Sequence, residues 1–195
     1  MTEPDLIRRA KAGDSQAMTE LLSGHATRAY RLALHVVRNK ADAEDATQNA
    51  FVKAFTNLDR FDERRPFAPW LLRIVTRECL NLLRAEKTRF AFWQRQARVV
   101  ETEDSPESIV VDSAVHRDVV RAVSRLKTPD RLVLTLSYFM GFSEAEISEA
   151  MGIKRGTVKW RKHKALARLR ELVKREFPGL GEAALGTLGS EGTTR

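Results

Sequence analysis

"SEAEISEAMGIKRGTVKWRKHKALARLRE", residues 143–171, is the stretch of sequence that decides the fold. Ser143 and Glu146 have the S-x-x-E spacing of a capping box, which predicts that a short helix begins here. Gly152 supplies the tight turn that ends this helix, and a second helix is expected after the dipeptide IK. Two helices joined by a short turn, the second rich in lysine and arginine, are typical of a helix-turn-helix that binds DNA.

The second helix of this motif is strongly basic and has distinct apolar and polar arcs. Residues 152–175 contain ten basic residues and one acidic residue. The apolar arc predicted to face the core consists of Val158, Ala165, Leu166, Leu169, Leu172 and Val173. The N-terminal part of such a helix normally reaches base edges in the major groove, where lysine and arginine also bind phosphates. The predicted DNA contacts are Lys154, Arg155, Thr157, Lys159, Trp160, Arg161, His163 and Lys164.

Two residues of this helix depart from the simple pattern. Trp160 falls on the outward arc, so burial in the core does not explain it, and we expect it to pack on DNA or on a protein partner. Lys162 falls on the apolar arc, so its aliphatic stem is expected to cover apolar surface while its ammonium group reaches water. An ordinary solvated helix face is the alternative interpretation of so many lysines.

The charge distribution favours nucleic-acid binding over that alternative. The chain has 195 residues and a net charge of +8. Residues 60–99 contain ten basic and four acidic residues, whereas residues 100–118 contain one basic and six acidic residues. A solvated surface usually mixes charges of both signs evenly. Two separate basic blocks therefore indicate contact with a polyanion at two places.

The hydrophobic pattern is helical almost throughout, which predicts an all-α fold with two small helical domains. We expect the first domain to cover residues 1–85 and the second to cover residues 114–176. Residues 86–113, with the acidic cluster and a Ser-Pro dipeptide, are predicted to form a flexible linker. Residues 177–195 hold five of the ten glycines and are predicted to form a flexible tail.

The clearest amphipathic helix of the first domain covers residues 42–58. Its predicted buried face consists of Ala43, Ala46, Ala50, Phe51, Ala54, Phe55 and Leu58. Its polar flank presents Asp45, Gln48, Asn49 and Lys53, which suit contact with another protein better than contact with DNA. After the loop at 57–69 comes a further helix with an arginine stripe at Arg73, Arg77 and Arg84 that could lie on phosphates.

Taken together, residues 30–84 resemble region 2, and residues 119–172 resemble region 4, of bacterial sigma factors of the extracytoplasmic-function group. The resemblance implies a factor without a catalytic site or cofactor that binds core RNA polymerase and promoter DNA. It implies that residues 42–58 bind the polymerase clamp through Asp42, Asp45, Gln48, Asn49 and Lys53. Region 4 would read the −35 promoter element through the basic helix.

Region 2 in that family opens the −10 promoter element, and the loop at 57–69 matches the segment that captures an unstacked base. Extruding a base costs a few kcal/mol, which stacking and edge contacts must offset. The implied −10 contacts are Asn57, Phe61, Arg64, Arg65, Phe67, Arg73, Arg77 and Arg84. An anti-sigma factor is a further implied partner. The apolar cluster at Phe90, Phe92 and Trp93 is expected either to help that docking or to belong to a partial helix that packs on its own domain.

Other classes of function fit the sequence less well. A stand-alone helix-turn-helix regulator would not need residues 42–58, and an enzyme would need a nucleophile–base pair or phosphate loop that the sequence lacks. No metal or cofactor is expected, and Cys79 is predicted to be a buried, inert thiol. Without a signal peptide or a long apolar run, we expect a cytoplasmic protein that does not insert into membranes and is monomeric when free.

Overall fold

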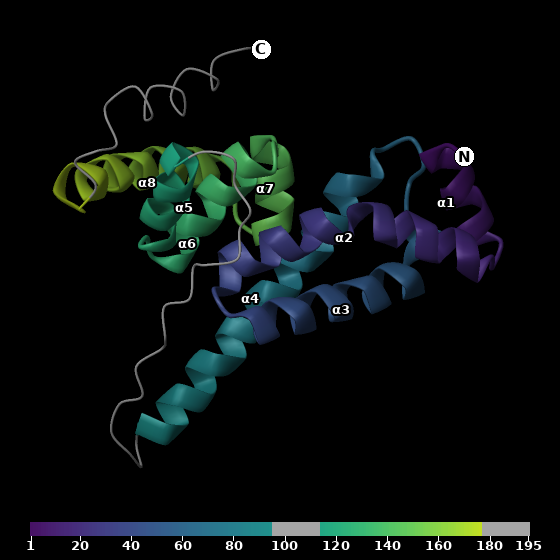
Figure 1. Cartoon of the computed structure of the whole chain (residues 1–195), viewed down its shortest axis with the longest axis horizontal. Helices are drawn as coiled ribbons and strands as arrows, with labels where there is room; N and C mark the ends of the chain where they lie inside the picture. The colour runs from purple at the N-terminus through teal and green to yellow at the C-terminus, as the bar shows by residue number, and fades with distance from the viewer. Residues whose placement is uncertain (95–113, 177–195) are drawn as a thin grey trace. The chain divides into compact units, whose positions relative to one another are not determined.

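The structure is a computed structural model that describes the backbone of residues 1–94 and 114–176 and the side chains of residues 1–85 and 119–176 (Figure 1). The chain divides into two compact units, Met1–Asp104 and Ser105–Arg195. Across the described backbone every regular element is a helix, so the predicted all-α class is confirmed. Most of the predicted linker and all of the predicted tail lie outside the described residues.

The first unit is a bundle of four α-helices and one short 3₁₀ turn. The elements are α1 (Glu3–Lys11), α2 (Ser15–Val37), α3 (Lys40–Thr56), η1 (Leu58–Arg60) and α4 (Phe67–Gln94). Side-chain caps fix where two of them begin: the Asp14 carboxylate accepts hydrogen bonds from the first turn of α2, and the Asn39 side chain accepts one from the Asp42 amide in α3. These caps hold the chain reversals in place.

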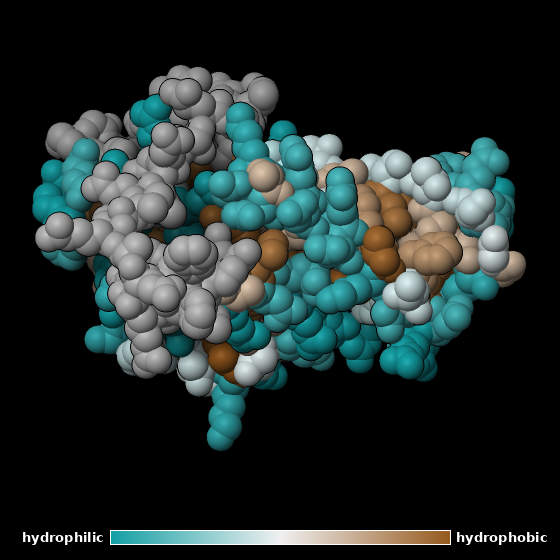
Figure 2. Space-filling view, turned by 90° about the horizontal axis from the view of Figure 1, so that it is seen from below, coloured by the Kyte–Doolittle hydropathy of each residue, from teal (hydrophilic) through white to brown (hydrophobic). Residues whose placement is uncertain are grey.

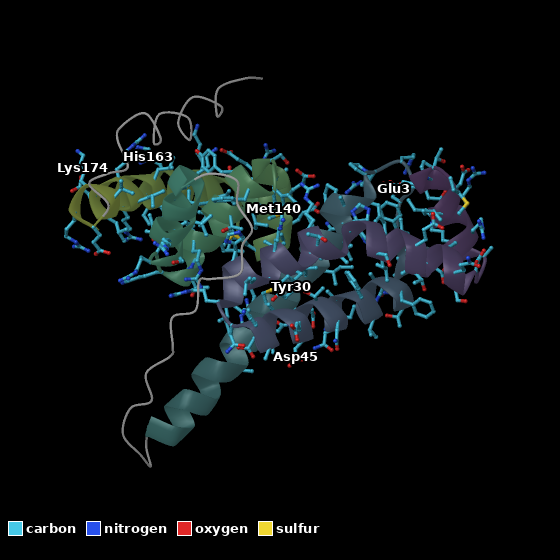
Figure 3. All side chains as sticks on the ribbon, viewed as in Figure 1. Glu3, Tyr30, Asp45, Met140, His163 and Lys174 are labelled. Carbon is cyan, nitrogen blue, oxygen red and sulfur yellow. The ribbon has the colours of Figure 1, made fainter. Side chains whose placement is uncertain are left out.

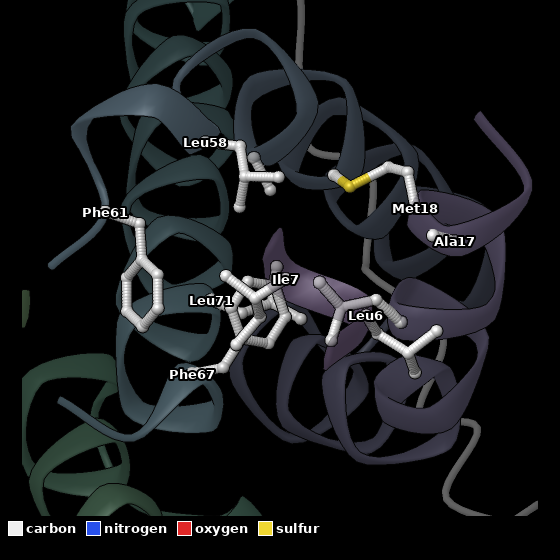
Figure 4. Packing of buried hydrophobic residues seen from close by; sticks show 10 residues of the cluster. Leu6, Ile7, Ala17, Met18, Leu58, Phe61, Phe67 and Leu71 are labelled. Carbon is white, nitrogen blue, oxygen red and sulfur yellow. The ribbon is translucent and has the colours of Figure 1, made fainter. Parts of the chain in front are cut away.

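The core of the first unit joins residues from both ends of the domain. Leu6 and Ile7 of α1 pack with Met18 of α2, and with Phe67 and Leu71 of α4 (Figure 4). On α3 the buried positions are mainly alanines, each of them fully enclosed: Ala43, Ala46, Ala50 and Ala54. Because alanine has only a methyl group, α3 can lie close against both α2 and α4.

The structure corrects the predicted helix faces and ends in the first unit. Phe55 was predicted to be buried, but 60% of it is exposed. The helix α4 begins at Phe67, inside the predicted loop. Pro69 is compatible with this early start, because the backbone nitrogens in the first turn of a helix have no hydrogen-bond partner within the helix. It also continues to Gln94, beyond the predicted domain end at residue 85, and projects past α3 in Figure 1.

The second unit contains the predicted helix-turn-helix. Its elements are α5 (Ala114–Ser124), α6 (Thr128–Leu134), the π-helical turn η2 (Thr135–Phe139), α7 (Glu144–Met151) and α8 (Arg155–Glu176). The capping box of Ser143 and Glu146 is present at the start of α7. Gly152 follows α7 with a φ of 66°, the left-handed conformation for which glycine is suited.

An ion pair holds the basic helix α8 on the rest of the second unit. Arg168 of α8 binds Asp130 of α6, whose side chain is almost completely buried while more than half of the arginine is exposed. The next residue, Arg131, is also buried, and its Nη1 donates to the Leu126 carbonyl at 3.0 Å. The orientation of α8 is therefore fixed by both apolar packing and buried polar contacts.

Candidate nucleic-acid interface

The outward face of α8 is a basic surface with a tryptophan at its centre. Lys159, Trp160, His163 and Lys164 are all exposed, and His163 is labelled on this helix in Figure 3. Trp160 is 58% exposed, and the Lys164 ammonium lies 5.9 Å from the centre of its ring. A cation at this distance is attracted to the negative face of the ring. The two side chains can therefore contact a ligand together.

The remaining predicted residues of α8 divide into exposed and enclosed groups. Lys154 and Arg155 are exposed at the start of the helix, whereas Thr157 and Arg161 are half-buried. The Arg161 Nε is fully enclosed, so this residue offers less to a ligand than its neighbours. Lys162 pairs with Glu144 of α7 at 3.7 Å, as expected for a lysine whose stem lies along apolar surface.

A second basic surface combines α4 with the loop that precedes it. Arg73 is half-buried on α4, while Arg77 and Arg84 are exposed on the same helix. In the loop, Arg64 and Arg65 are 89% and 67% exposed, respectively. These five arginines lie on α4 and the segment leading into it, as a surface that binds phosphates requires.

Asp62 organises the exposed part of this loop. Its carboxylate accepts hydrogen bonds from the Arg64 backbone amide at 3.1 Å and from the Arg64 guanidinium at 2.9 and 3.1 Å. Its carbonyl accepts one from the Arg65 amide at 3.0 Å. The hydrogen bonds from Arg64 hold the pKa of the Asp62 carboxyl below its usual value. The loop therefore has a defined turn that directs both arginines outward.

Two aromatic residues predicted to contact DNA are instead buried beneath the loop. Phe61 is 3% exposed and Phe67 is fully enclosed. Their ring centres lie 5.5 Å apart at 87°, and Trp70 lies 5.1 Å from Phe61 and 5.4 Å from Phe67. Because this cluster packs edge-to-face and tilted in the core, neither phenylalanine offers a ring face to a DNA base in this structure.

Asn57, also predicted to contact DNA, is used by the end of α3. Its side-chain amide donates to the Lys53 carbonyl at 2.8 Å and so satisfies a carbonyl in the last turn of that helix. The residue closes α3 and begins the short turn η1. In this structure the side-chain amide of Asn57 is therefore hydrogen-bonded to the backbone of α3.

The outward face of α3 has a different chemical character. Asp45, Gln48 and Asn49 are exposed, and Asp45 is labelled in Figure 3. Val52 and Phe55 continue the same face and are 62% and 60% exposed. Figure 2 shows hydrophobic residues, in brown, reaching the surface among hydrophilic ones. A mixed apolar and polar face of this kind is typical of contact with another protein.

Two further residues predicted on this face have roles within the bundle. The Lys53 ammonium lies 2.7 Å from both carboxylate oxygens of Glu78 on α4, so it joins the two helices. Asp42 is half-buried in the first turn of α3, where the helix dipole favours a negative charge. The sequence analysis did not include Val52 and Phe55 among the residues of this outward face, although both continue the helical spacing that begins at Gln48.

The described residues offer no site for metal chemistry and no reactive thiol. Among those residues no three His, Cys, Asp or Glu side chains are grouped to hold a metal ion. Burial raises the pKa of the Cys79 thiol to about 12, so it is protonated at neutral pH. No helix there is long and apolar enough to cross a membrane.

Comparison with known proteins identifies the family. The family model of Sigma-70 region 2 matches residues 21–89, and that of Sigma-70 region 4 matches residues 116–169. The ECF RNA polymerase sigma factor SigW of Bacillus subtilis (strain 168) is 33% identical over 177 residues, which are 85% of this chain and 93% of SigW. The chain belongs to the ECF sigma factors.

A second ECF sigma factor and a solved structure are also similar over most of the chain. SigE of Mycolicibacterium smegmatis is 33% identical over 88% of this chain and 68% of its own length. The solved structure of CnrH in complex with the cytosolic domain of CnrY has a TM-score of 0.62 at 25% identity, covering 89% of this chain and 98% of CnrH.

The fold is shared with a further solved structure. RpoE, in its complex with the anti-sigma factor NepR from Bartonella quintana, has a TM-score of 0.64 at 23% identity, covering 81% of this chain and 97% of that chain.

The region 2 match covers most of α2, all of α3 and most of α4, whereas the region 4 match covers α7 and most of α8, the two helices of the helix-turn-helix. In this ECF sigma factor the two basic surfaces thus lie on two different sigma regions.

Proposed function

We propose that this ECF sigma factor binds core RNA polymerase, contacts the −10 and −35 elements of promoters and starts transcription at a defined set of sites. The single observation that carries the proposal is that the chain has two basic surfaces, one on α4 with its loop and one on α8, together with a chemically different face on α3. The cytoplasm, where core polymerase works, is the proposed location.

The outward face of α3 is the proposed polymerase-binding surface. Val52 and Phe55 supply exposed apolar area, and Asp45, Gln48 and Asn49 supply a polar border. Stable protein interfaces combine an apolar centre with a polar rim, and a few apolar anchors usually supply most of the free energy. We assign Lys53 a bracing role, through Glu78, and Asp42 a role at the helix start.

The basic surface of α4 and its loop is the proposed binding site for the opened −10 element. Arg64, Arg65, Arg77 and Arg84 are exposed cations that can bind the phosphates of the separated strand. Phe61 and Phe67 are assigned to supporting the loop from within the core. The proposed region 2 domain is residues 1–85, extended by the end of α4.

The outward face of α8 is the proposed binding site for the −35 element. Its lysines and His163 suit phosphates and base edges, and the exposed ring of Trp160 suits contact with a sugar or a thymine methyl group. The proposed region 4 domain is residues 114–176. We propose that the factor acts by binding alone.

An anti-sigma factor is the proposed regulator of this protein. CnrH and RpoE, whose solved structures resemble this one, are both in complexes, and the partner of RpoE is an anti-sigma factor. The expected docking cluster of Phe90, Phe92 and Trp93 belongs to α4 by its backbone, but those side chains lie outside the described residues.

The test is run-off transcription with purified core polymerase on genomic DNA fragments, with the RNA 5′ ends mapped by sequencing. We expect RNA starts that share upstream sequence elements and that disappear when the factor is omitted. Absence of factor-dependent starts would contradict the proposal. If the purified protein instead bound DNA specifically but gave no starts with polymerase, it would be a stand-alone regulator.

A further inference from the structure

The last residue of α1 makes a long-range contact with the loop of the proposed −10 surface. The Lys11 ammonium donates a hydrogen bond to the Phe61 carbonyl at 2.8 Å and lies 2.9 Å from a carboxylate oxygen of Glu63. The Lys11 side chain is only 22% exposed. A single cation from the N-terminal helix thus holds two residues of a loop that lies 50 residues further along the chain.

The contact is supported from beneath by the hydrophobic core. Leu6 and Ile7, on the same helix, pack in one cluster with Phe61 and Phe67. The loop is therefore fixed from two sides: its aromatic residues are buried below, and its Phe61 carbonyl is bound by Lys11. Residues 62–66 connect these anchors, and Asp62 holds Arg64 and Arg65 in a turn.

The charge of Lys11 also affects what the loop presents to DNA. Glu63 is the acidic residue next to Arg64, and about half of its side chain is exposed. An unpaired carboxylate at this point would repel the phosphates of an approaching strand. Paired with Lys11, Glu63 is neutralised locally. Asp62 pairs with Arg64 and Arg65, so the loop together with Lys11 keeps a net positive charge.

We propose that Lys11 is a positioning residue for promoter opening: it fixes the loop in the conformation that captures the separated −10 strand. The proposal rests on the proposed −10 role of this surface. Lys11 does not itself need to touch DNA, because it acts through the Phe61 carbonyl and the Glu63 carboxylate. The N-terminal helix α1 is then a part of the DNA-binding apparatus.

The test compares Lys11→Met with Arg8→Met in the full-length protein. Both substitutions remove one cation from α1, so they lower the net charge of the protein by the same amount. Arg8 is exposed and pairs with Asp5 within its own helix, and it makes no contact with the loop in the structure. Lys11→Arg keeps the charge and the donors and serves as the conservative variant.

Two measurements separate positioning from general stability. Hydrogen exchange of the free protein reports whether the Arg64 and Arg65 amides, which are hydrogen-bonded to Asp62, become less protected. Fluorescence anisotropy of the holoenzyme reports affinity for a labelled single strand with the −10 sequence taken from the mapped start sites. Because a hydrogen bond to a charged group typically contributes a factor of about ten or more, we expect Lys11→Met to weaken strand binding about tenfold.

The expected pattern is faster exchange of the loop and weaker strand binding for Lys11→Met, near-wild-type values for Arg8→Met, and substantial recovery for Lys11→Arg. The affinity for core polymerase should not change. Equal effects of the Lys11→Met and Arg8→Met substitutions would overturn the proposal and leave the −10 assignment intact. If the wild-type holoenzyme failed to bind the strand, the −10 assignment itself would be overturned.

Discussion

The exposed phenylalanine of α3 and the exposed tryptophan of α8 allow a paired test of the two proposed surfaces. Phe55 is 60% exposed and Trp160 is 58% exposed, so each ring is nearly as accessible as the other. Full burial of a phenylalanine side chain contributes roughly 1.5–3 kcal/mol. Burying the exposed part of Phe55 at an interface should therefore contribute about 1–2 kcal/mol, or about five- to thirtyfold in affinity.

The assay measures three quantities for Phe55→Ala and Trp160→Ala: affinity for core polymerase, affinity for a duplex with the −35 sequence, and melting temperature. We expect Phe55→Ala to weaken only polymerase binding, because its ring lies on the outward face of α3. Trp160→Ala should weaken only duplex binding. Both variants should unfold within about 0.5 kcal/mol of the wild type, since neither ring is part of the core.

The outcome that would refute this reasoning is equally specific. If Phe55→Ala bound polymerase as tightly as the wild type, the outward face of α3 would not be the docking surface. If it lowered the melting temperature by several degrees, the side chain would have to be buried in solution. Loss of polymerase binding in Trp160→Ala would mean that α8 faces the enzyme instead of DNA.

Three further predictions concern stability and reactivity. In urea denaturation, Arg168→Met should lower the free energy of unfolding by roughly 3 kcal/mol or more, because it leaves the buried Asp130 carboxylate unpaired. Asp130→Asn should lower it less, because the arginine that remains can turn to water. Equal losses in the two variants would contradict this. With its pKa at about 12, against 9.0 for an ordinary thiol, Cys79 should be alkylated at pH 8 roughly a thousandfold more slowly in the folded than in the unfolded protein. Gly152→Ala should destabilise by about 1–2 kcal/mol because φ is 66°, and Gly152→Asn by less, as thermal melts would show.

The thiol prediction has a consequence for alkaline stability. Because the pKa of Cys79 is raised in the folded state, the folded protein holds this proton where the unfolded chain releases it. The contribution to the free energy of unfolding is therefore present below about pH 9 and is lost as the pH rises towards 12. Cys79→Ala should remove this part of the pH dependence, as denaturation curves at several pH values would reveal.

Sequence periodicity predicted the second unit well because its signals are local. The capping box at Ser143, the turn at Gly152 and the arcs of α8 all depend on residues within one or two turns of one another. Trp160 was expected on the outward arc and is exposed there. Where the helix geometry alone decides which side faces the core, the sequence is sufficient.

The first unit was predicted less completely, for two physical reasons. At about 100° per residue, Phe55 lies about 120° around α3 from Ala43, at the edge of the predicted arc, and the narrow alanine stripe leaves that edge in water. The contact of Lys11 with Phe61 joins residues that are far apart in the chain. Such a contact depends on how α1 packs against the loop, which no local pattern encodes.

The alanine stripe of α3 separates the residues that fold this helix from the residues that it offers to a partner. Its four buried alanines have little room to grow, since an added methyl or methylene group in a packed core typically costs about 1–3 kcal/mol. The opposite face can change at almost no cost in stability. The binding preference of this face, which we propose docks on core polymerase, can therefore be redesigned by substitutions there without changing how α3 packs in the bundle.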